Sequence, residues 1–284
     1  MSASNDLLFQ MAKLAVAGKT VLVTGASGEI GFAVAKAFRQ SGAHLVLTGS
    51  NQDKLDKSVQ GLPAGEGKVW SYVCDLRSRE QTEEFVRKTV DECSPVDILV
   101  NNAGFALAAD APFWEQDLDN VSTVMDVNVR GLMNVTHGVL KYHMMKRAPH
   151  PAGTILMMSS ITGHQAPLKE FFEASYHTSK AAIEGFSNVL RHELVGTNVR
   201  VLVHRPGFVD TEFHRRRNNY DEAKTAAMFE GVAPLVADDI ATGVLWQCAQ
   251  LERVSVVLME TLPTSQRSLY SVDREWEKRN GSAE

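Results

Sequence analysis

At three places in the chain a tyrosine is followed four positions later by a lysine, a pairing that can serve acid–base chemistry. The pairs are Tyr142 with Lys146, Tyr176 with Lys180, and Tyr220 with Lys224. A free phenol has a pKa of about 10, but an adjacent ammonium favours the phenolate and lowers that pKa. On a helix each pair would share one face, so spacing alone does not choose among them. Context favours Tyr176, because it follows a strand candidate that ends in Ser159–Ser160 and precedes two small alanines that permit close packing.

A glycine-rich turn near the start of the chain predicts a binding site for a dinucleotide. It lies between the strand candidate Thr20–Val23 and a segment of helical apolar period, which is the context that such a turn requires. Gly25 would permit the tight turn, Gly28 the close approach of a pyrophosphate, and Gly31 the packing of helix on strand. The phosphate charge would then meet the helix N-terminus.

These features resemble the single-domain branch of the short-chain dehydrogenase/reductase family. The segments that carry the resemblance are Thr24–Gly31, Asn101–Gly104, Ser160–Gly163 followed by Tyr176 and Lys180, and Pro206–Thr211. The resemblance covers about residues 17–266 and implies an oxidoreductase that moves a hydride between a nicotinamide cofactor and a CH–OH or carbonyl group.

The resemblance also implies roles for four catalytic residues. Tyr176 would exchange a proton with the substrate oxygen, and Lys180 would support it and bind the nicotinamide ribose. Ser160, preferred to Ser159 because it begins the Ser-Ile-Thr-Gly motif, would hold the carbonyl. Asn128 would support a water chain for the proton.

By the same resemblance, a larger set of residues would contact the cofactor. These are Gly25, Ser27, Gly28, Ile30, Gly31, Ser50, Asn51, Asp75, Leu76, Asn102, Ala103, Gly104, Tyr176, Lys180, Pro206, Gly207, Val209 and Thr211. Asp75 would meet the adenine and Thr211 the nicotinamide carboxamide. At the end of the second strand, Ser50 and Asn51 are neutral donors that tolerate a ribose 2′-phosphate, which favours NADP(H) and leaves NAD(H) as the second option. The arginine found in many NADP-specific relatives at the position of Ser50 is absent.

Several residues depart from the family pattern. Glu29 stands where most single-domain members have glycine, and the spacing of Gly25, Gly28 and Gly31 also fits the extended epimerase and dehydratase branch. Asn101–Gly104 and the short chain favour the single-domain branch. Residues 165–173 look like an insertion that borders the substrate pocket. Arg205 would meet either a substrate carboxylate or a neighbouring aspartate.

From residue 206 onward the chain resembles a narrower group, the NADP-dependent 3-hydroxy acid dehydrogenases that accept serine and L-allo-threonine. The matching residues are Pro234–Leu235, Asp238–Ile240 and Leu262–Gln266. The expected substrate is therefore a small carbonyl compound or alcohol, with a 3-hydroxy acid or a related ketone as the nearest class. Two alternatives stay open: an extended-branch nucleotide-sugar epimerase or dehydratase, and a non-catalytic dinucleotide-binding regulatory protein.

The elements that must position these residues alternate regularly along the chain. Seven apolar runs are strand candidates: Thr20–Val23, His44–Thr48, Lys68–Cys74, Val96–Val100, Thr154–Met158, Asn198–His204 and Val254–Leu258. Helical segments separate them, with long helices expected over 118–147 and 174–195. This alternation predicts an α/β protein with a doubly wound parallel sheet, a Rossmann fold of seven strands flanked by helices in a single domain.

We expect the chain to consist of an N-terminal extension over 1–16, the single dehydrogenase domain over 17–266 and a C-terminal tail over 267–284. The polar excursion 208–235 follows the sixth strand, where ligands of open α/β sheets bind, so it would form a lid over the substrate.

Composition excludes other classes of function. A net charge of −5 argues against nucleic-acid binding, and we interpret the short Arg215–Arg217 cluster as a solvated face. Three widely spaced cysteines and the absence of metal-ligand spacing predict a cytoplasmic protein without a metal site or disulfides. No apolar run is long enough for a membrane span. We expect a homodimer or homotetramer built on the two long helices, with Val135, Val139, Tyr142, Phe186 and Leu190 buried between chains.

Overall fold

The computed structural model describes residues 12–107, 111–167 and 169–281. Its centre is a seven-stranded parallel sheet with the strand order β3-β2-β1-β4-β5-β6-β7. The strands are β1 (Thr20–Thr24), β2 (His44–Gly49), β3 (Val69–Val73), β4 (Val96–Asn101), β5 (Ala152–Met158), β6 (Asn198–Pro206) and β7 (Leu258–Thr261). The order reverses between β1 and β4, so the carboxyl ends of the central strands open a crevice there. The prediction of a doubly wound α/β sheet is confirmed.

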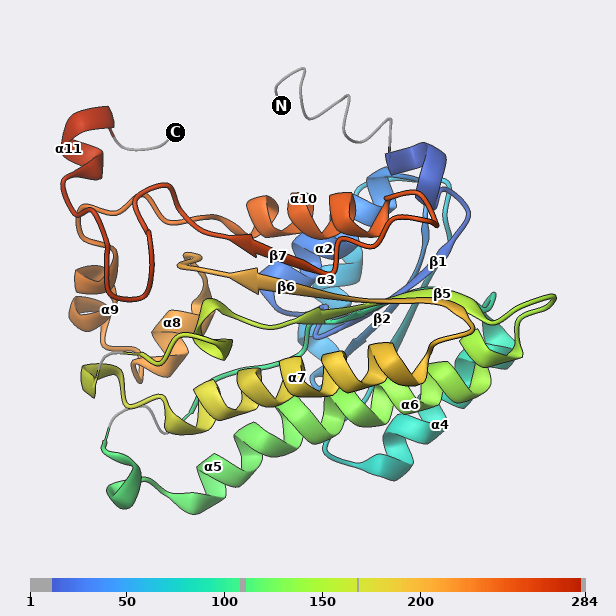
Figure 1. Cartoon of the computed structure of the whole chain (residues 1–284), viewed down its shortest axis with the longest axis horizontal. Coiled ribbons are helices and arrows are strands. Elements are labelled where there is room, and N and C mark those ends of the chain that lie inside the picture. Colours follow the sequence, from blue (N-terminus) through green and yellow to red (C-terminus); the bar gives the residue numbers. More distant parts are fainter. Residues whose placement is uncertain (1–11, 108–110, 168, 282–284) are drawn as a thin grey trace.

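Helices cover both faces of the sheet (Figure 1). One face carries α2 (Glu29–Gln40), α3 (Gln52–Gln60) and α10 (Ala237–Cys248), and the other carries α4 (Arg79–Glu92), α5 (Leu118–Met125), α6 (Leu132–Tyr142) and α7 (Ala174–Glu193). The two apolar layers between helices and sheet form two separate buried clusters. The inner strands β1, β2, β4 and β5 are buried on both sides, which is why their sequences are continuous apolar runs, whereas the edge strands β3 and β7 are partly exposed.

The long helix expected over 118–147 is divided into several pieces. A π-helical turn, Asp126–Gly131, separates α5 from α6, and a short 3-10 turn, Met144–Lys146, follows α6. Gly131 lies so close to the segment after β3 that an added Cβ would be 2.9 Å from Cβ of Leu76. The wider π turn is a feature often found at functional sites, and here it carries Asn128.

The last strand lies further along the chain than the sequence pattern predicts. The expected strand Val254–Leu258 is wrong; β7 spans Leu258–Thr261 and pairs with Val203–Pro206 of β6. In the preceding apolar stretch, Arg200 donates to the carbonyl oxygen of Val254 and Gln247 donates to that of Val256, and the Val257 carbonyl accepts from the Val203 N–H of β6. An edge strand needs only one paired neighbour, so its apolar pattern is a weak guide to its bounds.

The ends of the described chain pack against the rest of the molecule. Ala12 and Val16, which precede the expected domain boundary at residue 17, are buried in the core beneath α2 and α10. The segment 208–235 contains α8 (Glu212–Arg217) and α9 (Glu222–Phe229). Arg274, in the tail that ends with α11 (Trp276–Asn280), donates hydrogen bonds to the carbonyl oxygens of Ala227 and Glu230.

Candidate active site

The glycine turn between β1 and α2 has the backbone that its glycines require. Gly25 has φ of +65°, and a Cβ there would be 2.8 Å from Cα of Ala103. A Cβ on Gly31 would collide with the carbonyl oxygen of Gly25. Gly28 is different, because its nearest neighbour would be 3.5 Å away, in ordinary contact. Packing within the protein therefore explains Gly25 and Gly31, whereas Gly28 leaves space at the cleft.

The end of β4 is tied to this turn by hydrogen bonds. The side-chain amide of Asn102 donates from Nδ2 to the carbonyl oxygen of Thr24 at 3.0 Å. The backbone N–H groups of Asn102 and Ala103 both donate to Oγ1 of Thr24 at 3.0 Å. These contacts fix the position of Gly25 relative to Asn101–Gly104. The Asn102 side chain is thus engaged in holding the turn.

A cleft of about 1150 Å³ runs along the carboxyl ends of the strands. With the exception of Asn128, every residue expected to act in catalysis or to contact the cofactor lines it. The cleft thus joins the glycine turn, the ends of β2 and β3, the Asn101–Gly104 segment, the Tyr176 region and the Pro206–Thr211 segment in one continuous space. Its size and position suit an extended dinucleotide with a small molecule beside it.

Ser160, Tyr176 and Lys180 meet on the floor of this cleft. The Ser160 hydroxyl hydrogen-bonds the Tyr176 hydroxyl, and Ser159 turns away to donate to Oε1 of Glu184 at 2.8 Å. One helical turn after Tyr176 on α7, the Lys180 ammonium lies 5.6 Å from the tyrosine ring centroid and donates to the carbonyl oxygen of Met158 at 2.8 Å. The structure thus groups Ser160 rather than Ser159 with the tyrosine.

The two other tyrosine–lysine pairs lie in different surroundings. The Tyr142 hydroxyl donates to the Glu83 carboxylate, away from the cleft. Tyr220 lines the cleft but is 60% exposed, and its φ of +61° places it outside the helix that contains Lys224. Neither pair shares a helical face in the way that the spacing allowed.

Burial dominates the ionisation of the central pair. The pKa of Tyr176 is raised well above its ordinary value, first by burial and then by the Glu173 carboxylate, while the hydrogen bond with Ser160 and the charge of Arg217 oppose the rise. Burial lowers the pKa of Lys180 to about 8. The expected lowering of the Tyr176 pKa by Lys180 is not observed: burial dominates the shift, and Lys180, whose ammonium donates to the Met158 carbonyl, is not among the groups that change this pKa.

Asn128 is fully buried behind the cleft on the π-helical turn. Its Oδ1 accepts from the Phe105 N–H at 3.0 Å, and its Nδ2 donates to the Phe105 carbonyl at 2.9 Å and to Oγ of Ser179 at 3.0 Å. A Cβ added to Gly104 would be 3.1 Å from Oδ1 of Asn128 and 3.6 Å from Nζ of Lys180. Asn128 therefore fixes the wall of the cleft next to Lys180.

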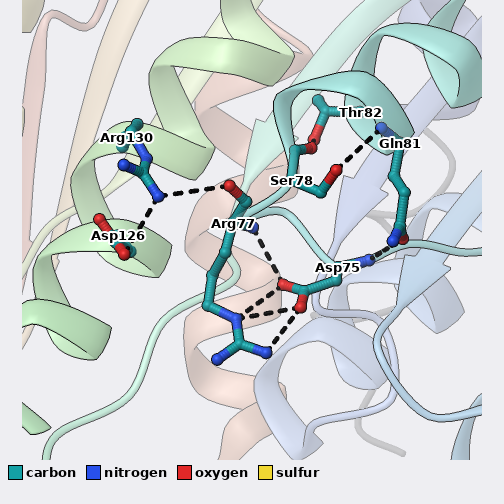
Figure 2. A network of polar contacts seen from close by, with 7 residues as sticks. All are labelled: Asp75, Arg77, Ser78, Gln81, Thr82, Asp126 and Arg130. Carbon is teal, nitrogen blue, oxygen red and sulfur yellow. Dashed lines mark hydrogen bonds and ion pairs between the residues drawn. The ribbon is translucent and has the colours of Figure 1, made fainter. Parts of the chain in front are cut away.

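At the other end of the cleft, Asp75 is held by a residue that the sequence pattern did not reveal. Figure 2 shows Arg77 donating from Nε and Nη2 to the Asp75 carboxylate at 2.7 to 3.0 Å. These hydrogen bonds lower the pKa of Asp75. Arg130 donates to the Arg77 carbonyl at 3.4 Å and pairs with Asp126, which links the π-helical turn to this end of the cleft. An adenine contact would share the Asp75 carboxylate with Arg77.

The start of α3 borders the cleft beside Ser50. Asn51 caps this helix, since its side chain accepts a hydrogen bond from the Lys54 N–H at 2.9 Å. Lys54 also lines the cleft and is exposed. The sequence pattern named Ser50 and Asn51 here but missed Lys54.

Glu29, the residue that replaces a family glycine, reaches across the cleft. Its Oε2 accepts a hydrogen bond from the Glu212 N–H at 2.8 Å. Glu212 is the first residue of α8, so this contact joins the glycine turn to the 208–235 segment.

The helix α8 also brings a charged residue and an aromatic ring to the region of Tyr176. Arg217 forms an ion pair with Glu173, and both side chains are buried. The ring of Phe213 lies 5.3 Å from that of Tyr176, centroid to centroid. The interpretation of Arg215–Arg217 as a solvated face is wrong for Arg217, because α8 folds back over the cleft; only tertiary contact could reveal this.

Arg205 does not reach the cleft. Its guanidinium pairs with Glu184 and Glu260, and hydrogen bonds from Arg205 contribute to a lowered pKa of Glu184. Arg205 is absent from the residues that line the cleft. Of its two expected partners, the acidic neighbour is the one observed, as glutamate in place of aspartate.

No group of three or more His, Cys, Asp or Glu side chains among residues 12–107, 111–167 and 169–281 is placed to hold a metal ion. None of the helices in these ranges is long and apolar enough to cross a membrane.

Comparison with known proteins places this geometry in a family. The family model for short chain dehydrogenases matches residues 19–222. Sulfoacetaldehyde reductase 2 of Chromohalobacter salexigens is 34% identical over 256 residues, which are 90% of this chain and 98% of the relative. An NADP-dependent 3-hydroxy acid dehydrogenase of Shigella flexneri is 31% identical over 247 residues, 87% of this chain and 95% of the relative.

The solved closed form of a serine dehydrogenase complexed with NADP+ superposes with a TM-score of 0.78 at 30% identity, covering 87% of this chain and 96% of that one. With its glycine turn, its Ser160–Tyr176–Lys180 cluster and these relatives, the chain belongs to the short chain dehydrogenase family.

Proposed function

We propose that this oxidoreductase transfers a hydride between NADP(H) and the carbonyl or alcohol carbon of a small 3-hydroxy acid or related anionic carbonyl compound. The observation that carries the proposal is the cluster of Ser160, Tyr176 and Lys180 on the floor of a cleft that continues to the glycine turn. The complete acid–base set argues against a regulatory protein without turnover. The full-length likeness to dehydrogenases and reductases favours this activity over a sugar epimerase.

The residues present fit a dinucleotide. Gly28 leaves open space beside the N-terminus of α2, where backbone N–H groups favour a pyrophosphate. We propose that Thr211 and Val209 contact the nicotinamide end, and that Ser50, Asn51 and Lys54 surround the ribose at the other end. When bound, the cofactor would supply the hydride.

The relatives named above suggest the substrate class. Sulfoacetaldehyde, serine and 3-hydroxy acids share one arrangement, in which a single carbon separates the reacting carbon from a sulfonate or carboxylate group. We propose the same arrangement for the substrate of this chain.

The chain's own residues then have defined tasks. The Tyr176 phenol, held protonated by burial, would donate its proton to the carbonyl oxygen during reduction. Ser160, already hydrogen-bonded to the phenol, would hold that oxygen in reach. Lys180 has a pKa lowered to about 8, so near neutral pH it can take up and return a proton with little cost. Asn128 keeps the adjoining wall in place.

Turnover of carbonyl compounds tests this function directly. The purified protein should oxidise NADPH in the presence of sulfoacetaldehyde or acetoacetate, which is followed by the nicotinamide absorbance. NADH in the same assay measures the preference between the two cofactors. Absence of NADPH oxidation with every member of a panel of small anionic aldehydes and ketones would exclude the function.

We further propose that the protein works in the cytoplasm as a homodimer or homotetramer. The three cysteines are free thiols, which agrees with a reducing compartment. The outer sides of α6 and α7 expose apolar residues, among them Met133 and Val189.

A further inference from the structure

The buried ion pair between Arg217 and Glu173 shifts the pKa of Tyr176 but has no binding role in the function proposed above. It joins the last residue of α8 to the residue that immediately precedes α7. Both residues line the cleft, and Glu173 lies three positions before Tyr176. We propose that Arg217 binds the anionic group of the substrate, and that Glu173 is the counter-ion it releases when the substrate enters. This inference rests on the proposed function, because it identifies what recognises the anion of that substrate.

The pair lines the same cleft as the Tyr176 hydroxyl. The side chains of Arg217 and Glu173 are only 7% and 2% exposed. Phe213, on the same short helix as Arg217, packs on the Tyr176 ring, and Glu173 is three positions before Tyr176. The carboxylate raises the pKa of the phenol and the guanidinium lowers it. An anion bound at Arg217 would therefore share the cleft with the carbonyl that Tyr176 protonates, as a substrate with one intervening carbon requires.

In the described chain, no hydrogen bond from a third group supports the contact between Glu173 and Arg217. Oε1 of Glu173 contacts Nη1 of Arg217, and among the described residues no group besides Arg217 hydrogen-bonds this oxygen. A buried ion pair repays its desolvation only when further hydrogen bonds complete it. Burial also raises the pKa of Glu173. A carboxylate or sulfonate on the substrate could accept two parallel hydrogen bonds from the guanidinium fork, which is the stronger arrangement.

Aromatic walls around the pair complete a site for a short anionic molecule. The Arg217 guanidinium lies 5.1 Å from the ring centroid of Phe171, and Phe213 packs on Tyr176. Phe171 belongs to the segment 165–173, which we expect to be an insertion, and Phe213 belongs to α8. Water-poor walls of this kind strengthen a charge–charge contact.

Other arginines near the site differ from Arg217 in a way that can be tested. Arg216 also lines the cleft, but it is exposed and lies 4.8 Å from the ring centroid of Phe105. Arg205 is partly buried in ion pairs outside the cleft. They supply two matched controls, one a neighbour on the same helix and one a paired arginine elsewhere.

The experiment compares acetoacetate with acetoacetamide, which has the same shape without the charge. Wild-type protein should prefer acetoacetate. Arg217→Met should lower kcat/KM for acetoacetate roughly 10- to 100-fold, the range expected when hydrogen bonds to a charged group are lost, and should change kcat/KM for acetoacetamide less than about threefold. Arg216→Met and Arg205→Met should leave the ratio of the two substrates near its wild-type value.

The variant Glu173→Gln distinguishes a role of the ion pair in substrate recognition from a role that is only structural. If Glu173 competes with the substrate for Arg217, removing its charge should lower KM for acetoacetate while KM for acetoacetamide stays constant. If the pair only holds α8 in place, both Glu173→Gln and Arg217→Met should impair the two substrates equally. That result, or a loss of acetoacetate preference in Arg216→Met rather than Arg217→Met, would overturn the proposal.

A binding measurement distinguishes failure of this inference from failure of the proposed function. Malonate should raise the melting temperature of the wild-type protein more than malonamide does, and Arg217→Met should abolish the difference. If the protein reduces neither acetoacetate nor acetoacetamide yet shows this difference, the proposed function fails and Arg217 remains an anion site. If acetoacetate is reduced but malonate stabilises wild type and Arg217→Met equally, the role of Arg217 is refuted alone.

Discussion

The hydroxyl of Tyr176 is buried beside Ser160 and its pKa is raised, so we propose that the protonated phenol donates a proton to the substrate at neutral pH. Tyr176→Phe deletes only this hydroxyl, and we expect kcat to fall by roughly 10²- to 10⁴-fold while the protein stays folded. Tyr142→Phe and Tyr220→Phe serve as controls, since Tyr142 bonds to Glu83 and Tyr220 lies outside a shared helical face with its lysine. Steady-state assays and circular dichroism check both points. A fully active Tyr176→Phe enzyme would remove this residue from the mechanism.

Discrimination between NADPH and NADH also belongs to single residues. Ser50 lines the cleft where β2 ends, and no carboxylate faces it from its own strand. Ser50→Asp would set a carboxylate against a 2′-phosphate, a like-charge contact that should lower kcat/KM for NADPH by an order of magnitude or more and spare NADH. Ser50→Arg should raise the preference for NADPH by adding a planar donor fork.

The matched control for this prediction is Ser58→Asp. Ser58 lies on α3, and its hydroxyl donates to the Lys54 carbonyl without lining the cleft. The same added charge at that site should leave the ratio of kcat/KM for NADPH and NADH unchanged. Equal ratios in Ser50→Asp, Ser50→Arg and wild type would show that the end of β2 does not face the ribose phosphate.

At the scale of elements, the contact between Glu29 and the Glu212 N–H joins α2 to α8 across the cleft. The carboxylate begins α2, where the phosphates of a dinucleotide are expected, and like charges there oppose binding. We therefore expect Glu29→Gly to lower Kd for NADPH several-fold, measured by nicotinamide fluorescence. Glu29→Gln, which keeps an acceptor for the N–H but removes the charge, should act in the same direction. A weaker affinity in both variants would mean that the contact chiefly orders α8 for the cofactor.

At the scale of the whole molecule, the helices α6 and α7 lie on the same face of the sheet (Figure 1). The expected interface residues Val135, Val139 and Leu190 are buried within a single chain, so that part of the interface prediction is wrong. Met133 and Val189 are 40% and 58% exposed on these helices. If these helices pair between chains, Val189→Glu should lower the molar mass measured by light scattering. Leu251→Glu, at a 59% exposed site just after α10, the helix on the opposite face of the sheet, should leave the mass unchanged.

The sequence by itself determined the alternation of strands and helices, the glycine turn and the choice of Tyr176 among three candidates. These features are local, because apolar periodicity and short motifs at fixed spacing reflect the backbone conformation of the segment that contains them. The predicted bounds of the seventh strand and the prediction of one long helix over 118–147 are wrong for a related reason. An edge strand and a π-helical turn depend on the neighbour they pack against, here β6 and Leu76.

Only the tertiary structure decided which charged side chains meet at the cleft and what each of them contacts. Glu29 and Glu212 are 183 positions apart, and Arg217 reaches Glu173 only because α8 folds back over α7. The upward shift of the Tyr176 pKa likewise depends on burial, and the spacing of a tyrosine and a lysine in the sequence carries no information about burial. Contacts between distant segments and the desolvation they cause have no local pattern in a single sequence, so they emerge only when the chain is folded.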